Sequence, residues 1–145
     1  MSQASSNTLE TGIAKLIYQN IALANIGDGS GLQPSAVPGN IYLALYTTDP
    51  TDADSGTEAT YTNYARIAVV RSAVGFTVAS ADVTNAAVVT FDTSGGTPNT
   101  ITHVATHTAI TSGDMLHYGE LTTPFTVLTN GIPKFEIGNF KVTFQ

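Results

Sequence analysis

Residues 100–110 read TITHVATHTAI, a run in which apolar and polar side chains largely alternate. A period of two is typical of a half-buried β-strand. Residues 41–47, IYLALYT, carry the same period, and the chain is rich in threonine and valine, which suit a pleated surface. Further strands, separated by turns, are predicted at residues 64–71, 76–78, 83–91, 115–121, 125–129 and 135–144.

The N-terminal part of the chain has a helical period instead. Asn7 is a candidate cap, with Glu10 three residues further on, and the glycines from Gly27 onward would end the helix. The predicted helix covers residues 8–24, and its apolar stripe consists of Leu9, Ile13, Leu16, Ile17, Ile21 and Ala24.

These patterns predict a mainly β fold. Because strands never alternate with helices along the chain, a parallel α/β fold is excluded. An antiparallel β-sandwich or a jelly-roll-like barrel, with one N-terminal α-helix, is expected. Residues 1–7 are expected to form a mobile arm, and residues 8–145 a single β-rich domain.

The composition excludes several functions. With no cysteine, the chain has neither disulfides nor a cysteine zinc site, and a net charge of −6 argues against nucleic-acid binding. No membrane span or secretory signal is expected, so the protein is predicted to be made in the host cytoplasm. Only 11% of the residues are charged, which favours burial of much of the surface against partners.

The acidic loop between residues 49 and 60 is a weak candidate for binding Ca²⁺. Carboxylate oxygens are the ligands that Ca²⁺ prefers, but the spacing here does not match the twelve-residue calcium loop. The other interpretation is a solvated turn that carries the charge of the protein. The candidate ligands are Asp49, Asp52, Asp54 and Glu58.

No reaction centre is apparent in the sequence. His103 and His107 would lie about 13 Å apart on one strand, too far to share one ion easily, although His117 on a neighbouring strand could approach either. The glycine-rich loop from Gly27 follows a helix and lacks the Lys-Ser/Thr pair of a phosphate loop. No catalytic residue, cofactor or metal is therefore assigned, and the protein is expected not to be an enzyme.

Five residues are candidates for contacts with partners. Arg66 and Arg71 flank one predicted strand, and each is expected to pair with a carboxylate, preferably within the domain but otherwise across an interface. Tyr42 and Tyr46 share one face of a strand, where the alternative to core packing is an intersubunit contact or sugar stacking. Leu16 lies on the helical stripe, and an aspartate there is expected to disrupt folding or assembly.

The chain also resembles a family of small proteins of tailed bacteriophages and prophages that are commonly described as tail-fibre-like. The family's motifs are an "ANIGD…GL" loop, a strand leading to "LHTADP" or similar, a "Y-x-x-YAR" strand and a closing "LLYSGALT" hairpin. Tyr46-Thr47-Thr48 departs from the family's usual His-Thr-Ala. The motifs correspond here to Ala24–Asp28, Gly31-Leu32, Leu45–Pro50, Tyr61 with Tyr64–Arg66, and Leu116–Thr122.

The resemblance implies a virion structural protein. A capsid decoration (cement) protein that stabilises the outer shell is the favoured interpretation, with the major capsid protein or other virion proteins as partners and a homo-oligomer, preferably a trimer. A fibre shaft is disfavoured because the chain has no internal repeat. A tail-associated role, as a fibre base, adaptor or receptor-binding head, is the first alternative, and a carbohydrate-binding module is the second.

Overall fold

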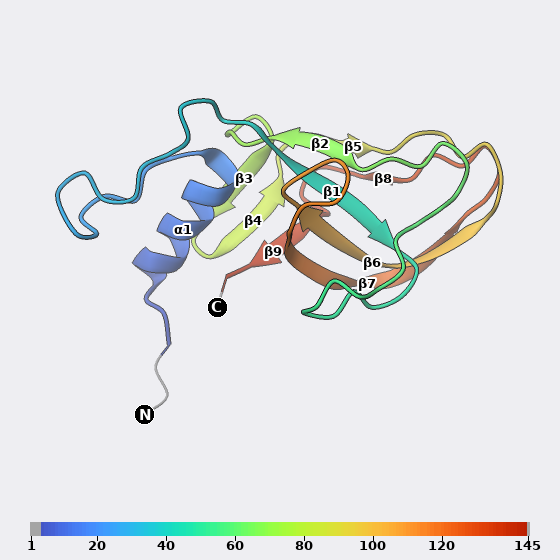
Figure 1. Cartoon of the computed structure of the whole chain (residues 1–145), viewed down its shortest axis with the longest axis horizontal. Helices are drawn as coiled ribbons and strands as arrows, with labels where there is room; N and C mark the ends of the chain where they lie inside the picture. The colour runs from blue at the N-terminus through green and yellow to red at the C-terminus, as the bar shows by residue number, and fades with distance from the viewer. Residues whose placement is uncertain (1–3, 145) are drawn as a thin grey trace. The chain divides into compact units, whose positions relative to one another are not determined.

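The computed structural model describes residues 4–144. These form two compact units, each built from separate segments of the chain: unit 1 from residues 1–39, 70–88 and 135–145, and unit 2 from residues 40–69 and 89–134. Because the segments of the two units are interleaved, the single domain over residues 8–145 stays a prediction. The elements in Figure 1 are α1 (Asn7–Gln19), β1 (Asn40–Tyr46), β2 (Ile67–Val70), β3 (Phe76–Ala79), β4 (Asp82–Asn85), β5 (Val89–Thr90), β6 (Asn99–His107), β7 (Met115–Val127), β8 (Lys134–Phe135) and β9 (Lys141–Thr143).

The structure confirms a mainly β fold with antiparallel sheets and one N-terminal helix. The sheets have the strand orders β2-β1-β6-β7, β3-β4-β9 and β5-β8. The expected jelly-roll-like barrel is wrong for the described residues, since the largest sheet is open, with β2 and β7 as its two edges. None of the helices in the described part of the chain is long and apolar enough to cross a membrane.

The helix is shorter than predicted and starts earlier. Its cap is Ser6 rather than Asn7, because the Ser6 side chain accepts a hydrogen bond from the Leu9 amide, and Asn7 is already helical. It ends at Gln19 because Asn20 turns into the left-handed region, with a φ of 56°. The predicted arm therefore overlaps the helix at Asn7, and residues 1–3 of that arm lie outside the described residues.

Tyr18 anchors the helix within unit 1. Its fully buried ring meets Phe76 of β3 edge-on at a centroid distance of 4.9 Å, and it meets Phe144 at 6.2 Å. The Gln19 side chain also donates a 2.7 Å hydrogen bond to the Phe76 carbonyl. Edge-to-face aromatic pairs add to the free energy of burying the rings. The fully buried side chains of the helix are Ala14 and Tyr18, and neither belongs to the predicted apolar stripe. The face that packs on β3 therefore differs from the predicted one, whose Leu9 is 40% exposed.

Four of the predicted strands are divided or joined in the structure, and the strand predicted at 64–71 is shortened to β2. The strand predicted at 83–91 divides into β4 and β5, and the one predicted at 135–144 divides into β8 and β9 around Gly138, whose φ is 79°. The strands predicted at 115–121 and 125–129 form one strand, β7, with a register shift before Phe125. Pro124, which has no amide hydrogen, lies in the irregular part.

Strand β1 is the centre of unit 2. Its register with β6 runs from Tyr42 opposite His107 to Tyr46 opposite His103. Residues 43–46 are all buried, so both faces of this strand are covered. Because the pairing is antiparallel, Tyr46 at the end of β1 lies opposite His103, and His107 at the end of β6 lies opposite Tyr42.

Candidate functional site

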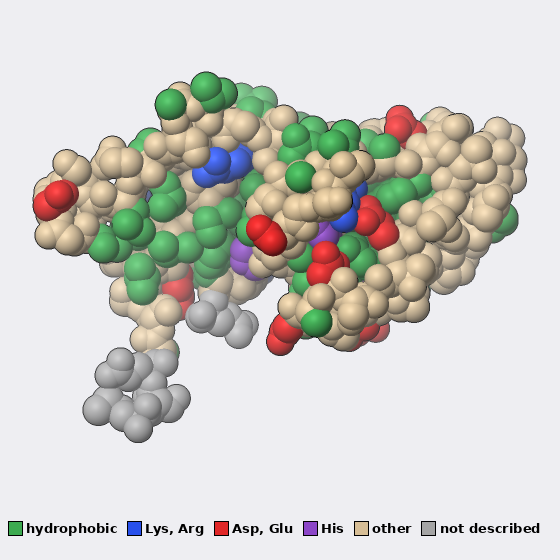
Figure 2. Space-filling view, viewed as in Figure 1, with side chains coloured by type: hydrophobic (Ala, Val, Ile, Leu, Met, Phe, Trp, Pro, Cys, Tyr) green, Lys and Arg blue, Asp and Glu red, His purple; other side chains and the backbone are tan. Residues whose placement is uncertain are grey.

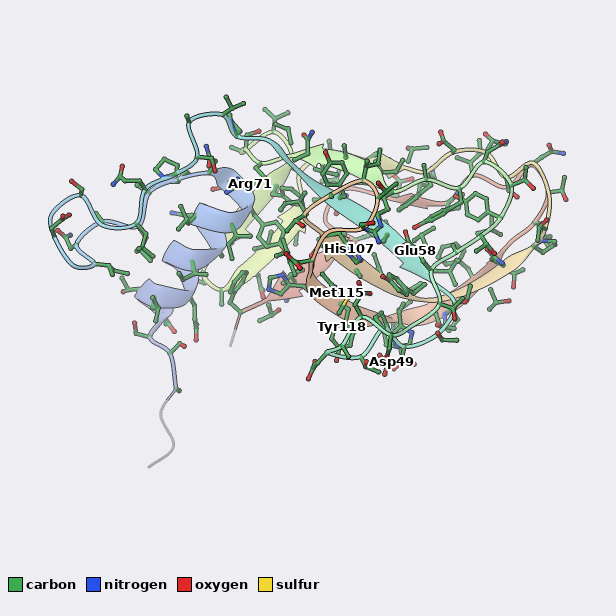
Figure 3. All side chains as sticks on the ribbon, viewed as in Figure 1. Asp49, Glu58, Arg71, His107, Met115 and Tyr118 are labelled. Carbon is green, nitrogen blue, oxygen red and sulfur yellow. The ribbon has the colours of Figure 1, made fainter. Side chains whose placement is uncertain are left out.

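A partly buried polar network joins the acidic loop to the four-stranded sheet of unit 2. The Tyr46 hydroxyl donates a 2.6 Å hydrogen bond to Asp54 Oδ1 and lies 3.0 Å from His107 Nε2. The two rings are stacked, with centroids 6.1 Å apart. His107, labelled in Figure 3, is fully buried at the end of β6. The network holds the loop against the sheet through side chains that are up to 61 positions apart in sequence.

The second half of the network is centred on Arg66. Its Nε and Nη2 atoms donate to the two carboxylate oxygens of Glu58 at 2.9 and 2.8 Å. Its Nη1 atom donates to the carbonyl oxygens of Ala109 and Ser112 at 3.1 and 2.8 Å. One guanidinium therefore fastens two loops, the acidic loop and the loop that connects β6 to β7.

Tyr64 completes this half of the network. Its hydroxyl donates a 2.7 Å hydrogen bond to Glu58 Oε1 and accepts a 3.0 Å hydrogen bond from the Leu45 amide. The ring stacks on Phe91 at a centroid distance of 6.4 Å and meets Tyr61 edge-on at 5.3 Å. Tyr64 thus links the ion pair to β1 and to the aromatic core of unit 2.

The hydrogen bonds fix the protonation of His107. The Tyr46 hydroxyl gives its only proton to Asp54, so His107 must donate from Nε2, which leaves Nδ1 without a proton in the neutral ring. Nδ1 is buried without a hydrogen-bond partner among the described residues, 3.9 Å from Asp54 Oδ2. Burial, and then the nearby charge of Arg66, lower the pKa of His107 and keep the ring neutral.

The tyrosines of the network act as hydrogen-bond donors and not as bases. Burial, followed by the hydrogen bond to Asp54, raises the pKa of Tyr46 far above its usual range. Burial, followed by the hydrogen bond to Glu58, does the same to the pKa of Tyr64. Burial and the charge of Asp92 raise the pKa of Tyr61 to about 12. All three phenols keep their protons at physiological pH.

Unit 2 should lose stability on acidification. Burial lowers the pKa values of His107 and His117 below 6.5. These two histidines therefore bind protons more weakly in the folded chain than in the unfolded chain. Although burial alone would raise it, the pKa of Glu58 is lowered below 4.5 by hydrogen bonds from Arg66 and Tyr64. We therefore expect the free energy of unfolding to fall as the pH drops below 6.5, and to fall again below 4.5. Denaturation at pH 7.5, 5.5 and 4.0 measures this.

The variant His107→Gln serves as the control for the first step. An amide can replace the hydrogen bond to Tyr46 but does not titrate, so the loss of stability between pH 7.5 and 5.5 should be smaller than in the wild type. If the free energy of unfolding fell equally in both proteins, protonation of His107 would not contribute to the pH dependence.

The four candidate calcium ligands are not gathered into one cluster. Asp49 accepts from the Thr51 amide, Asp52 from the Tyr118 hydroxyl, and Asp54 from Tyr46. Glu58 is engaged by Arg66. Over residues 4–144, no three His, Asp or Glu side chains are arranged to hold a metal ion. The geometry instead resembles the alternative interpretation of this loop, an acidic turn, here fastened to the sheet.

The three histidines have separate surroundings. His103 faces Thr102, whose hydroxyl lies 2.8 Å from its Nδ1 atom, and pairs across the sheet with Glu120. His117 lies on β7 opposite Thr106. Only His107 enters the network described above.

The interface candidates lie in both units. Leu16 and Tyr42 are half-buried, whereas Tyr46 and Arg66 are buried in the network. The expected carboxylate partner of Arg66 is Glu58, within the same unit. Arg71, by contrast, is held through backbone carbonyls and a serine hydroxyl in unit 1, rather than by a carboxylate among the described residues. Contact of these five residues with partners stays a prediction.

Asn85 is a structural residue that the sequence patterns did not indicate. It is 1% exposed at the end of β4, and its amide donates to the carbonyls of Ala87, Phe135 and Glu136 at 2.8, 3.3 and 2.9 Å. Its Oδ1 atom accepts from the Phe140 amide at 3.0 Å. The available signal was an asparagine, a residue that is rare in strands, within the predicted strand at residues 83–91.

The fold and the network define a class: a small, mainly β protein whose buried polar groups fasten loops to open antiparallel sheets. Residues 5–143 match the sequence model of the family described as "Podophage GP4 fiber I protein gp80". The chain belongs to this family, and it is a bacteriophage virion structural protein, as the resemblance indicated. No curated protein matches the chain.

Proposed function

We propose that this protein is a tail-associated component of the virion, used in building or attaching a fibre. The observation that carries the proposal is the family match, which spans residues 5–143 and therefore almost all of the chain. The family's description names a podophage fibre protein. Among the roles considered from the sequence, the tail-associated alternative agrees better with this description than capsid decoration does.

The role proposed is passive. A fibre component works by binding its neighbours in a fixed geometry, which requires a rigid surface and no reaction centre. In the network of unit 2, Glu58 pairs with Arg66, and Asp54 accepts from Tyr46. Such fixed contacts hold loops in one conformation and lower the entropy lost on assembly.

The number of copies in each particle tests the proposal. A tail component follows the cyclic symmetry of the tail, so about 3–18 copies are expected, whereas decoration of a shell requires hundreds. Mass spectrometry of purified virions, with labelled peptides of this chain and of the major capsid protein as standards, gives this number. A copy number in the hundreds would overturn the proposal in favour of decoration.

Location gives an independent check. Antibodies against this chain, bound to intact virions and viewed by electron microscopy, should mark the tail. Labelling spread evenly over the capsid would contradict the proposal. Binding of carbohydrate stays a separate prediction, and a glycan array measures it directly.

A further inference from the structure

Residues 20–39 of unit 1 form a long connection between α1 and β1, which we call the finger (Figure 1). Of its residues, 16 are exposed, and Asp28 is the only charged one. Connections longer than about 12–15 residues without a helix or strand are uncommon in compact domains and usually serve a function. The finger therefore needs an explanation beyond joining two elements.

The finger has a fixed internal structure. Leu23 and Leu32 exchange two backbone hydrogen bonds, of 3.0 and 2.9 Å, that pair its two sides. At its tip, Asp28 Oδ1 accepts from the amides of Ser30 and Gly31 at 2.8 and 3.2 Å. Its shape is thus formed before any partner arrives.

The base of the finger is fastened to the rest of unit 1. The side-chain amide of Asn20 exchanges hydrogen bonds with the backbone of Ser35, at 2.8 and 2.9 Å. Arg71 donates to the Leu16 and Ile17 carbonyls at the end of α1, and to the Pro38 carbonyl in the finger. The guanidinium therefore ties the finger to the helix, where its positive charge also suits the helix C-terminus.

The finger exposes large apolar side chains. The exposed fractions are 47% for Ile21, 41% for Ile26, 40% for Leu32 and 75% for Val37. Figure 2 shows hydrophobic side chains on this part of the surface. Several apolar side chains on one preformed segment are a mark of a contact surface.

The charge distribution indicates what covers this surface. Unit 1 carries three basic and four acidic residues, a net charge of −1, whereas unit 2 carries two basic and seven acidic residues, a net charge of −5. A different protein could bring basic groups to the acidic unit, but a second copy brings only the same negative charge. The charge repulsion between two copies is therefore smaller if they meet through unit 1 than through unit 2. It is smallest if they meet through the finger, where Asp28 is the one charged residue.

We propose that the finger is the surface through which one copy of this chain binds a second copy. It buries the exposed apolar side chains of the finger against unit 1 of the neighbour. A stable interface uses about 800 Å² and 20–30 residues from each partner, and the finger, with 16 exposed residues, supplies much of such a set. This inference deepens the proposed function, because a fibre component present in several copies requires a contact between copies.

The test compares the self-association of four variants of the full chain. Ile26→Asp and Val37→Asp place a charge on the finger, and Ile132→Asp and Leu128→Asp place the same charge on unit 2, at side chains that are 54% and 61% exposed. Sedimentation of the purified protein gives the dissociation constant. We expect an increase of about tenfold or more for the finger variants, the size of a central interface residue, and little change for the unit 2 variants.

Gly31→Ala adds a variant without a new charge. Gly31 has a φ of 65°, and a side chain there would overlap the Leu23 carbonyl oxygen, so the finger should lose its internal pairing and self-association should weaken. Circular dichroism establishes that each variant is folded. A wild type that stays monomeric at about 100 µM, or equal effects of the finger and unit 2 variants, would overturn the inference. Neither result would change the copy number or the location in the virion, so the proposed function is tested independently of this inference.

Discussion

Glu58→Ala should lower the free energy of unfolding by about 3 kcal/mol. The reason is the guanidinium of Arg66, whose side chain is only 8% exposed and which would lose both of its bonds to a carboxylate. The carbonyls of Ala109 and Ser112 would remain as acceptors but cannot neutralise the charge. Tyr64 would lose its acceptor as well. Denaturant unfolding followed by circular dichroism measures the change.

Two control variants separate charge from shape and burial from exposure. Glu58→Gln removes the charge but keeps the shape of the side chain and one acceptor oxygen, so it should lose less stability than Glu58→Ala. Asp82→Ala removes the partner of Lys141, another pair at 2.8 Å, but one that lies in solvent. Water replaces such a partner, so the stability should change little. If Asp82→Ala were as damaging as Glu58→Ala, burial of Arg66 would not explain the effect.

Asn85→Ala should also cost about 3 kcal/mol, because it removes four hydrogen bonds between a buried side chain and the backbone. The carbonyls of Phe135 and Glu136 and the amide of Phe140 all bond to this one side chain. Together they fasten the C-terminal segment of unit 1 to β4. Hydrogen exchange should show faster exchange of residues 135–143, alongside the loss of stability in denaturant.

Asn139→Ala is the matched control for Asn85→Ala. Asn139 lies in the same segment but is exposed, so its replacement removes a polar side chain that water already solvates. Stability should be close to that of the wild type. Equal destabilisation by both variants would indicate that the segment tolerates no substitution, and that the buried hydrogen bonds of Asn85 are not the cause.

The patterns that were predicted correctly are those that depend on short stretches of chain. Residues 41–47 and 100–110 alternate, and the structure has β1 and β6 there with a shift of one residue at the start. The pairing of Arg66 with a carboxylate was also predictable, because burying a guanidinium requires a partner. Which carboxylate it binds depends on where the acidic loop folds.

The errors in the fold have physical causes in the tertiary structure. The apolar stripe continues through Ile21 and Ala24, yet the helix ends at Gln19. Asn20 takes the left-handed conformation and bonds Ser35, and Leu23 pairs with Leu32, so the segment after the helix makes its hydrogen bonds within the finger. A helical period indicates that a helix is compatible with the sequence, and the contacts of the folded chain decide where it stops.

The sequence by itself determined the class of fold, the negative charge and its concentration around residues 49–58, and the resemblance to phage fibre proteins, which the family match confirms. Local periodicity and composition carry that information. Only the tertiary structure decided that Tyr46, Asp54 and His107 form one network, and that Asn85 holds a distant segment. Those contacts join residues that are far apart in sequence, and long-range burial, which no local pattern encodes, brings them together.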